Sequence, residues 1–75
     1  MKVLLIGKEG CRKCNQVKDM LKKRDIEYKY LDVNTVDGMA EIAYYGEDGS
    51  ALPIIVVNNR SFRSAIKAIK TIKGE

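Results

Sequence analysis

The sequence predicts an α/β domain with the element order β-α-β-α-β-β-α. Two apolar runs that contain β-branched residues, 2–6 and 54–57, are typical of buried strands. Segments whose apolar residues recur at helical spacing separate and follow these runs. At the start of the chain a strand, a helix and a second strand follow one another within about thirty residues, which is a βαβ unit with an expected right-handed crossover and parallel strands.

The βαβ unit occupies the first part of the chain. Residues 2–6 form its first strand, residues 7–10 turn the chain, and a helix runs from Cys11 to about Arg24. Basic residues at the end of this helix suit its negative C-terminal pole. Residues 26–31 alternate in polarity, as expected of a second strand. The residues predicted to face inward from the helix and this strand are Cys14, Val17, Met20, Leu21, Ile26, Tyr28 and Tyr30.

Two further helices are predicted. Asn34, with Asp37 three residues later, resembles a helix start, and Gly46 fits the end of that helix. Its inward stripe at i, i+3, i+4 and i+7 consists of Val36, Met39, Ala40 and Ala43. Ser64 caps the last helix, which ends at Gly74. The inward residues of the last helix are expected to be Ala65, Ile66, Ile69 and Ile72.

A hairpin is predicted between these two helices. Pro53 stands at the first position of the strand 54–57, where its missing N–H costs least. Asn58 and Asn59 form a two-residue turn, because asparagine tolerates the positive φ that such turns need. A short strand at 60–63 then returns along the first.

Length and composition define the class of protein. With 45% apolar and 32% charged residues, the chain of 75 residues predicts one soluble domain, residues 1–75, around a single core. No apolar run approaches the length of a membrane span, and the start lacks the longer apolar segment of a secretory signal, so we expect a cytoplasmic protein and a monomer. The net charge of +4 comes without a nucleic-acid-binding motif, so neither nucleic acid nor membrane is an expected partner.

The only two cysteines, Cys11 and Cys14, lie where the first strand gives way to the first helix. Their spacing puts both thiols on one face of the first helical turn, with Cβ atoms about 5–6 Å apart, close enough to form a disulfide. Basic residues on either side, Lys8, Arg12 and Lys13, add positive charge to that of the helix N-terminus. The helix N-terminus and the basic residues both favour the thiolate form of Cys11, and a thiolate is the attacking species in disulfide exchange. A Cys-x-x-Cys pair beside a βαβ unit in a reducing cytosol indicates a redox site.

These features resemble the glutaredoxins and their small relatives in the thioredoxin superfamily. The matching residues are the segment 8–14, with a lysine three residues before the first cysteine, then Leu52 and Pro53 at the family's cis-proline loop, and the pair 58–59, where many members have Asn-Gly. The resemblance covers essentially the whole chain. It implies a thioredoxin-like, glutaredoxin-type fold, with a mixed four-stranded sheet and helices on both faces.

The resemblance also implies roles for individual residues. Cys11 is the nucleophile that attacks a protein disulfide or a glutathione mixed disulfide, and Cys14 is the resolving thiol; no metal or organic cofactor is needed. Pro53 is the cis-proline beside them, and Leu52 offers backbone hydrogen bonds to an extended substrate. The residues expected to bind substrate are Lys8, Arg12, Lys13, Leu52 and Pro53.

Two departures from the glutaredoxin pattern leave the electron donor open. Glutaredoxins usually carry proline and an aromatic residue between the cysteines, where this chain has Arg12 and Lys13. The Gly-Gly-acidic segment that receives glutathione is replaced by residues 63–67. Phe62 and Arg63 after a short strand resemble instead the glutaredoxin-like redoxins that take electrons from a thioredoxin reductase. The reductant is therefore either glutathione or a thioredoxin-reductase-type flavoenzyme.

Two other functions stay open from sequence alone. The first is binding of a metal ion or an iron–sulfur cluster. Two thiolates supply half of the ligands of a tetrahedral site, and the chain has no histidine to supply the others. Such a site therefore requires a dimer in which Cys11 and Cys14 of both copies bind the same metal or cluster. The second is a thioredoxin-like binding module with inert cysteines, which predicts no reductase activity. Tyr44, Tyr45 and Phe62 edge a substrate groove or, as we favour, pack in the core.

Overall fold

The computed structural model describes residues 2–47, 49 and 51–74, and it confirms the predicted element order. The elements are β1 (Val3–Gly7), α1 (Arg12–Lys23), β2 (Lys29–Asp32), α2 (Val36–Tyr44), β3 (Ile54–Val57), β4 (Arg60–Phe62) and α3 (Ala65–Ile72). The second strand begins at Lys29 rather than at residue 26, so the expected alternation starts in the loop that leads into it.

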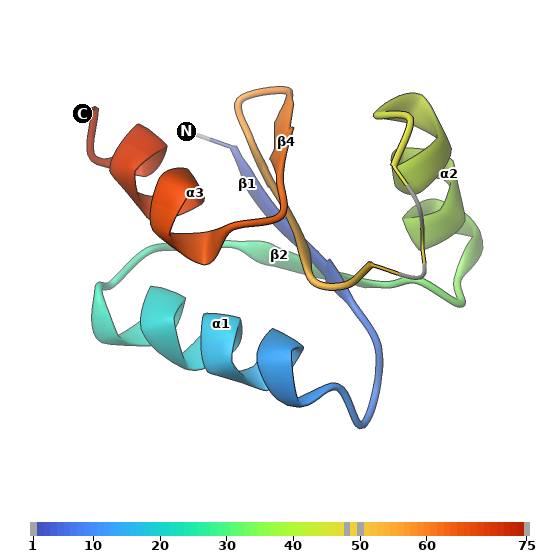
Figure 1. Ribbon diagram of the computed structural model, residues 1–75, viewed down its shortest axis with the longest axis horizontal. Helices are drawn as coiled ribbons and strands as arrows, with labels where there is room; N and C mark the ends of the chain where they lie inside the picture. Colours follow the sequence, from blue (N-terminus) through green and yellow to red (C-terminus); the bar gives the residue numbers. More distant parts are fainter. Residues whose placement is uncertain (1, 48, 50, 75) are drawn as a thin grey trace.

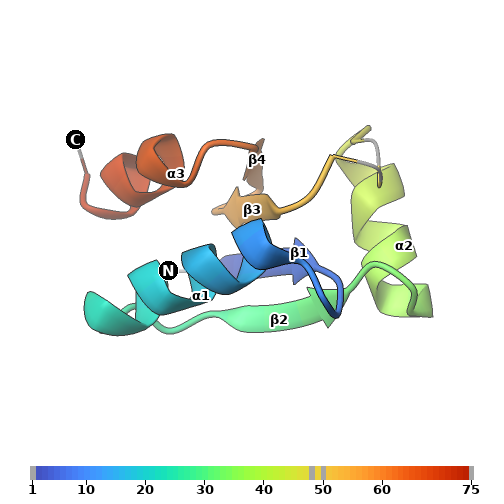
Figure 2. The same ribbon diagram turned by 60° about the horizontal axis from the view of Figure 1, so that its bottom comes forward.

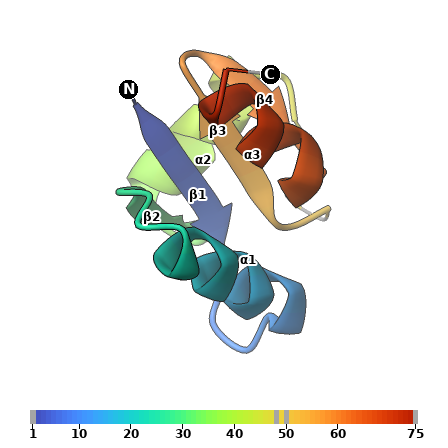
Figure 3. The same ribbon diagram turned by 90° about the vertical axis from the view of Figure 1, so that its left-hand side faces the viewer.

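The four strands form one mixed sheet in the order β2-β1-β3-β4 (Figure 1). β1 pairs in parallel with β2 and antiparallel with β3, and β3 pairs antiparallel with β4. Figure 2 and Figure 3 show α1 and α3 separated from α2 by the strands. Because helices cover both faces of the sheet, every residue of β1 and β3 is buried. The predicted fold class is confirmed.

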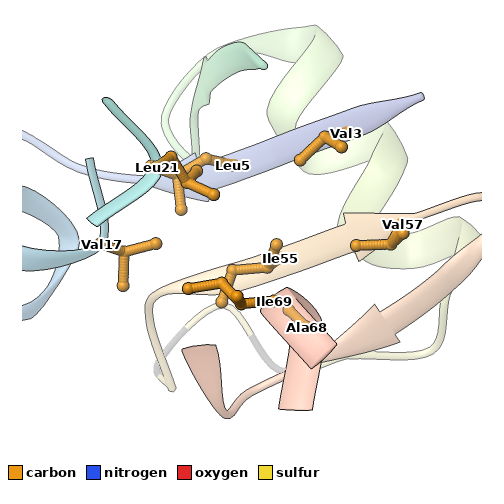
Figure 4. Close-up of a cluster of buried hydrophobic side chains, with 8 residues drawn as sticks. All are labelled: Val3, Leu5, Val17, Leu21, Ile55, Val57, Ala68 and Ile69. Carbon is orange, nitrogen blue, oxygen red and sulfur yellow. The ribbon is translucent and has the colours of Figure 1, made fainter. Parts of the chain in front are cut away.

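Two apolar clusters, one on each face of the sheet, hold the layers together. The cluster between the sheet and helices α1 and α3 consists of Val3, Leu5, Val17, Leu21, Ile55, Val57, Ala68 and Ile69 (Figure 4). The cluster under α2 consists of Leu4, Ile6, Ile42, Ile54 and Val56. Ile26, Tyr28 and Tyr30 pack against the first cluster, which confirms the face assigned to them. Each fully buried Val, Leu or Ile contributes roughly 1.5–3 kcal/mol, so these side chains fix where the helices lie.

The hairpin turn and the last helix cap are confirmed in detail. Asn58 and Asn59 have φ values of 49° and 71°, as a primed two-residue turn requires. The Ser64 side chain accepts a hydrogen bond from the backbone N–H of Lys67, and α3 begins at the next residue. These local signals therefore place β4 and α3 correctly.

The predicted inward stripe of α2 is wrong. Its four residues, Val36, Met39, Ala40 and Ala43, are all exposed, with Val36 at 78% and Met39 at 54%. The buried residues of the helix are Gly38 and Ile42, on the opposite side. The helix is therefore rotated so that its apolar stripe faces solvent.

The reason for this rotation lies in the contact between α2 and the end of β2. A Cβ atom at Gly38 would collide with the carbonyl oxygen of Asp32 and lie 3.1 Å from the Cα of Val33. The helix approaches the strand so closely that only glycine fits at the contact. The cap is Thr35 rather than Asn34, since the Oγ1 of Thr35 accepts a 3.1 Å hydrogen bond from the Gly38 N–H.

One residue of α3 also departs from the prediction. Ile66 is 62% exposed, whereas Ala68 is almost fully buried beside Ile69. Ile66 lies about 100° around the helix from Ala65, which puts it at the border of the face that meets the sheet. The other three predicted inward residues of this helix pack against the first cluster or belong to it.

Candidate active site

The turn between β1 and α1 sets the position of the first cysteine. The backbone N–H of Cys11 donates a 3.3 Å hydrogen bond to the carbonyl oxygen of Lys8, closing a four-residue turn. Gly10, the third residue of this turn, has φ of +79°. A type II turn needs a positive φ at that position, which glycine adopts without strain. The turn ends β1 and delivers Cys11 directly to the first turn of α1.

Cys11 is the N-cap residue of α1. Its backbone is extended, and its Sγ accepts a 3.2 Å hydrogen bond from the backbone N–H of Cys14. The sulfur thus occupies the place that a serine or aspartate oxygen takes in other helix caps, where unpaired N–H groups and the helix dipole favour negative charge. Cys11 and Cys14 are joined by a disulfide, with Cα atoms 5.2 Å apart.

The two cysteines differ in exposure. Cys14 faces inward from α1 and is 0% exposed, whereas Cys11 is partly exposed. A bulky disulfide outside the protein can therefore meet the sulfur of Cys11, while the sulfur of Cys14 can meet only that of Cys11. This asymmetry is the geometric requirement for one attacking and one resolving thiol.

Basic side chains flank the exposed cysteine. Lys8, Arg12 and Lys13 are all exposed around the turn and the start of α1, and the first turn of the helix contains no acidic residue. Glu9 lies in the same turn and offsets part of this positive charge. The three cationic residues lie within three residues of Cys11 in the sequence. Their role in substrate binding stays a prediction.

The loop before β3 lies at the same end of the sheet as the start of α1 (Figure 1), where Cys11 is the N-cap residue. Ile54, the first residue of β3, pairs with Ile6 near the end of β1, so the residues before Ile54 and the residues after Ile6 leave the sheet together. The peptide bond between Leu52 and Pro53 is cis. Pro53 is buried, and Leu52 packs against the cluster under α2. Their contribution to substrate binding stays a prediction.

Three residues of the site were not predicted as site residues from the sequence: Gly7 borders the side chain of Cys14, Tyr30 borders the same space, and Lys18 packs on Tyr30. A Cβ atom built on Gly7 would lie 2.8 Å from the Cys14 Sγ and 3.4 Å from the Cε1 of Tyr30. The ammonium group of Lys18 lies 3.9 Å from the centroid of the Tyr30 ring, a cation–π contact. Burial raises the pKa of Tyr30, and the negative charges of Asp32 and Glu9 raise it further, so the phenol is neutral. The only sequence signal for this part of the site was Gly7 itself, a glycine that ends an apolar strand just before a Cys-x-x-Cys pair.

The segment that departs from the family's glutathione-binding pattern is tied to the loop after α2. Glu47 accepts a 2.7 Å hydrogen bond from the Oγ of Ser61 and a 3.1 Å hydrogen bond from the Nε of Arg63. The bond from Ser61, followed by that from Arg63, lowers the pKa of Glu47 despite some desolvation. The guanidinium of Arg63 therefore already has a carboxylate partner within the chain.

The aromatic residues of the second half lie away from the cysteines or inside the protein. Tyr45 packs against the cluster under α2, and Phe62 packs against the cluster under α1 and α3. The packing expected of Tyr44 is wrong: it is 77% exposed and lines, with Lys2, an open hollow of about 360 Å³. Lys2 precedes β1 whereas the cysteines follow it, so this hollow lies at the other end of the sheet.

Within residues 2–47, 49 and 51–74, no three His, Cys, Asp or Glu side chains gather in a way that could hold a metal ion. None of the helices in the described part of the chain is long and apolar enough to cross a lipid bilayer.

Solved structures with the same fold are found over nearly the whole chain. A mutant of the thioredoxin-like protein BC3987 matches with a TM-score of 0.79 and 20% sequence identity, covering 96% of this chain and 99% of that one. The glutaredoxin Grx-1 from Archaeoglobus fulgidus matches with a TM-score of 0.68 and 18% identity, covering 97% of this chain and 87% of that one. Glutaredoxin 1 from Francisella tularensis, solved in complex with cacodylate, matches with a TM-score of 0.67 and 14% identity, covering 99% and 98% of the two chains.

Sequence comparison assigns the family. No curated protein matches the sequence significantly. The model of the glutaredoxin family matches residues 3–62, from the first residue of β1 to the last residue of β4, and includes both cysteines and the cis-proline. The chain therefore belongs to the glutaredoxin family and is a thiol–disulfide oxidoreductase, with its Cys11–Cys14 pair at disulfide distance.

Proposed function

We propose that this protein is a dithiol enzyme that reduces protein disulfides or glutathione mixed disulfides, with Cys11 as nucleophile and Cys14 as resolving thiol. The observation that carries the proposal is the difference in exposure between the two sulfurs. Cys11 is partly exposed at the N-cap of α1, and Cys14 is 0% exposed behind it. A substrate sulfur can approach only the first of them.

The reaction consists of two disulfide exchanges. The thiolate of Cys11 attacks one sulfur of the substrate disulfide, which forms a mixed disulfide and releases the other substrate sulfur as a thiolate that takes up a proton. Cys14, as a thiolate, then attacks the Cys11 sulfur, forms the Cys11–Cys14 disulfide and releases the second substrate thiol. The substrate gains two electrons and the cysteine pair loses two. An external dithiol or two thiols return the pair to the reduced form.

The chain's own groups favour the first step. The backbone N–H of Cys14, 3.2 Å from the Cys11 sulfur, and the other free N–H groups of the first turn of α1 stabilise negative charge on that sulfur. Lys8, Arg12 and Lys13 add positive charge around it, and they favour substrates with acidic groups near the disulfide. Leu52, next to the cis bond at the same end of the sheet, is the residue whose backbone pairs with an extended substrate.

We propose a cytoplasmic monomer with protein disulfides as substrates and without nucleic-acid or membrane partners. The electron donor is either glutathione or a thioredoxin-reductase-type flavoenzyme. The basic residues Arg12 and Lys13 between the cysteines, and the tie between Arg63 and Glu47, both depart from the residues that glutaredoxins use for glutathione. These departures favour the flavoenzyme as donor.

The first experiment is a redox titration. Metal-free protein is equilibrated in glutathione buffers of graded potential, quenched by alkylation, and its thiol state and glutathione adducts are read by mass. A two-electron transition at about −270 mV without adduct supports a flavoenzyme donor, whereas one at about −200 to −230 mV with an adduct on Cys11 supports glutathione. Protein alkylated at both cysteines beforehand is the control. Absence of a reversible disulfide at every potential contradicts the proposal.

A further inference from the structure

We propose that Gly7 is a positioning residue for the resolving thiol: because it lacks a side chain, the end of β1 leaves the space in which the sulfur of Cys14 lies. This inference rests on the proposed roles of Cys11 and Cys14. It gives a role to a residue of β1, whereas the residues with proposed roles in the reaction come from the turn, the helix and the proline loop.

The space in question is too small for any other residue. Gly7 is the last residue of β1 and is buried. A Cβ atom built on it would lie 2.8 Å from the Sγ and 3.1 Å from the Cβ of Cys14. Non-bonded carbon atoms prefer separations of about 3.5–4.0 Å, so even a methyl group forces something to move. The φ of Gly7 is not in the left-handed region, which means that the glycine provides room rather than an unusual backbone conformation.

The other atoms around this space are also held in place. The Cε1 of Tyr30 lies 3.4 Å from the same Cβ position, and the ammonium group of Lys18 packs on the Tyr30 ring at 3.9 Å from its centroid. Gly7 itself is paired with Asp32 of β2, so the strand backbone is held by the sheet. With the ring and the strand held, the atom that yields to an added methyl group is the sulfur of Cys14.

A displaced sulfur affects the second exchange in particular. In that step Cys14 must attack the Cys11 sulfur in line with the bond from that sulfur to the substrate, so that the Cys11–Cys14 bond forms as the mixed disulfide breaks. Misplacing a reacting atom by about 1 Å can cost on the order of a hundredfold in rate. The first exchange, attack by the partly exposed Cys11, does not involve the Cys14 sulfur.

The two exchanges can be followed separately with dithiobis-nitrobenzoate, an aromatic disulfide that releases a coloured thiolate. One equivalent is mixed with the reduced protein. The first coloured thiolate leaves when Cys11 attacks, and the second leaves when Cys14 resolves the mixed disulfide. For Gly7→Ala we expect the second phase to slow by about tenfold to a hundredfold. Gly49→Ala is the matched control, because a Cβ there meets only the side-chain ends of Val33 and Ile42 under α2, at 3.3 Å and 3.6 Å.

A second measurement covers the case in which Gly7→Ala folds poorly. Cys14→Ala removes the sulfur that the methyl group meets, so Gly7→Ala should lower the unfolding midpoint much more in the parent background than in the Cys14→Ala background. An equal loss in both backgrounds overturns the inference, as does a second phase within about twofold of the parent. If the parent itself shows no first phase at Cys11, the proposed function fails instead.

Discussion

The backbone N–H of Cys14 donates a hydrogen bond to the sulfur of Cys11, 3.2 Å away, so the proposed nucleophile is also the cap of α1. The Cys11 side chain therefore has two functions, capping the helix and attacking disulfides, and a suitable substitution can remove the second while keeping the first. Serine is the best-suited replacement, because its oxygen caps helices well but is a poor nucleophile toward disulfides.

Cys11→Ser should abolish disulfide reduction and leave the helix cap in place. Cys11→Ala should abolish it too, and should in addition cost about 1 kcal/mol of stability through loss of the cap. Insulin reduction and urea unfolding of the reduced proteins measure the two effects. Reductase activity near that of the parent in Cys11→Ser means that Cys11 is not the nucleophile.

Cys14→Ser should trap substrate on Cys11, because the mixed disulfide can no longer be resolved within the chain. Since Cys14 is 0% exposed, Cys14→Ala should be made alongside it to exclude effects of a buried hydroxyl. Mass spectrometry after mixing with a disulfide-bonded peptide measures the adduct. Release of the peptide as fast as from the parent contradicts the role assigned to Cys14.

Glu47 makes stability depend on pH. Its pKa is lowered in the folded protein by the hydrogen bonds from Ser61 and Arg63, so its stabilising contribution is present above the unfolded value of about 4.3 and is lost as pH falls through the folded value. Glu47→Gln should therefore cost on the order of 1 kcal/mol at neutral pH and progressively less in acid. Urea unfolding between neutral and acid pH checks this, with exposed Glu27→Gln as control. A constant difference across that range argues against the carboxylate as the cause.

The orientation of α2 can be tested with two apolar residues of similar size. Ile42 is 9% exposed and belongs to the cluster under the helix, whereas Met39 is 54% exposed. Ile42→Ala should lose about 2–5 kcal/mol of unfolding free energy. Met39→Ala should stay within about 0.5 kcal/mol of the parent. The reverse order in urea unfolding would mean that the helix packs through its apolar stripe.

The contact between α2 and β2 can be tested at Gly38, with Gly49 as the control position. Alanine normally stabilises a helix by about 0.5–1 kcal/mol over glycine. At Gly38 we expect the opposite, a loss of about 1–3 kcal/mol, because the added methyl group collides with the carbonyl oxygen of Asp32. Gly49→Ala, whose methyl group meets movable side-chain ends, should change stability by less than about 0.5 kcal/mol. Stabilisation by Gly38→Ala would show that the helix can move away from the strand.

The sequence predicted those elements whose signal is local. The residues of β1 and β3 are apolar throughout, the first helix has a regular stripe through Val17 and Leu21, and the Asn58-Asn59 turn needs only its own two residues. The rotation of α2 could not be predicted in this way. It depends on the carbonyl oxygen of Asp32, which the chain brings to Gly38 through space and which no periodicity in the helix reveals.

The candidate site divides in the same manner. Cys11, Cys14 and their basic neighbours lie within one short segment, so the sequence alone was enough to predict them as a group. Gly7 and Tyr30 come together only because β1 and β2 pair in parallel with a particular register, in which Gly7 faces Asp32 and Leu5 faces Tyr30. This register brings Tyr30 to Gly7, and the packing of α1 on β1 brings the sulfur of Cys14 to the same glycine.

The central place of β1 in the sheet bears on how the domain is made. Leu4 lies between Lys29 of β2 and Val56 of β3, so the second neighbour of the first strand is synthesised only after α1, β2 and α2. Both cysteines are therefore synthesised long before the sheet that supports them can close. A peptide that carries the redox pair but stops before Ile54 lacks this partner strand, so β1, which supports the pair, is left with one of its two edges unpaired.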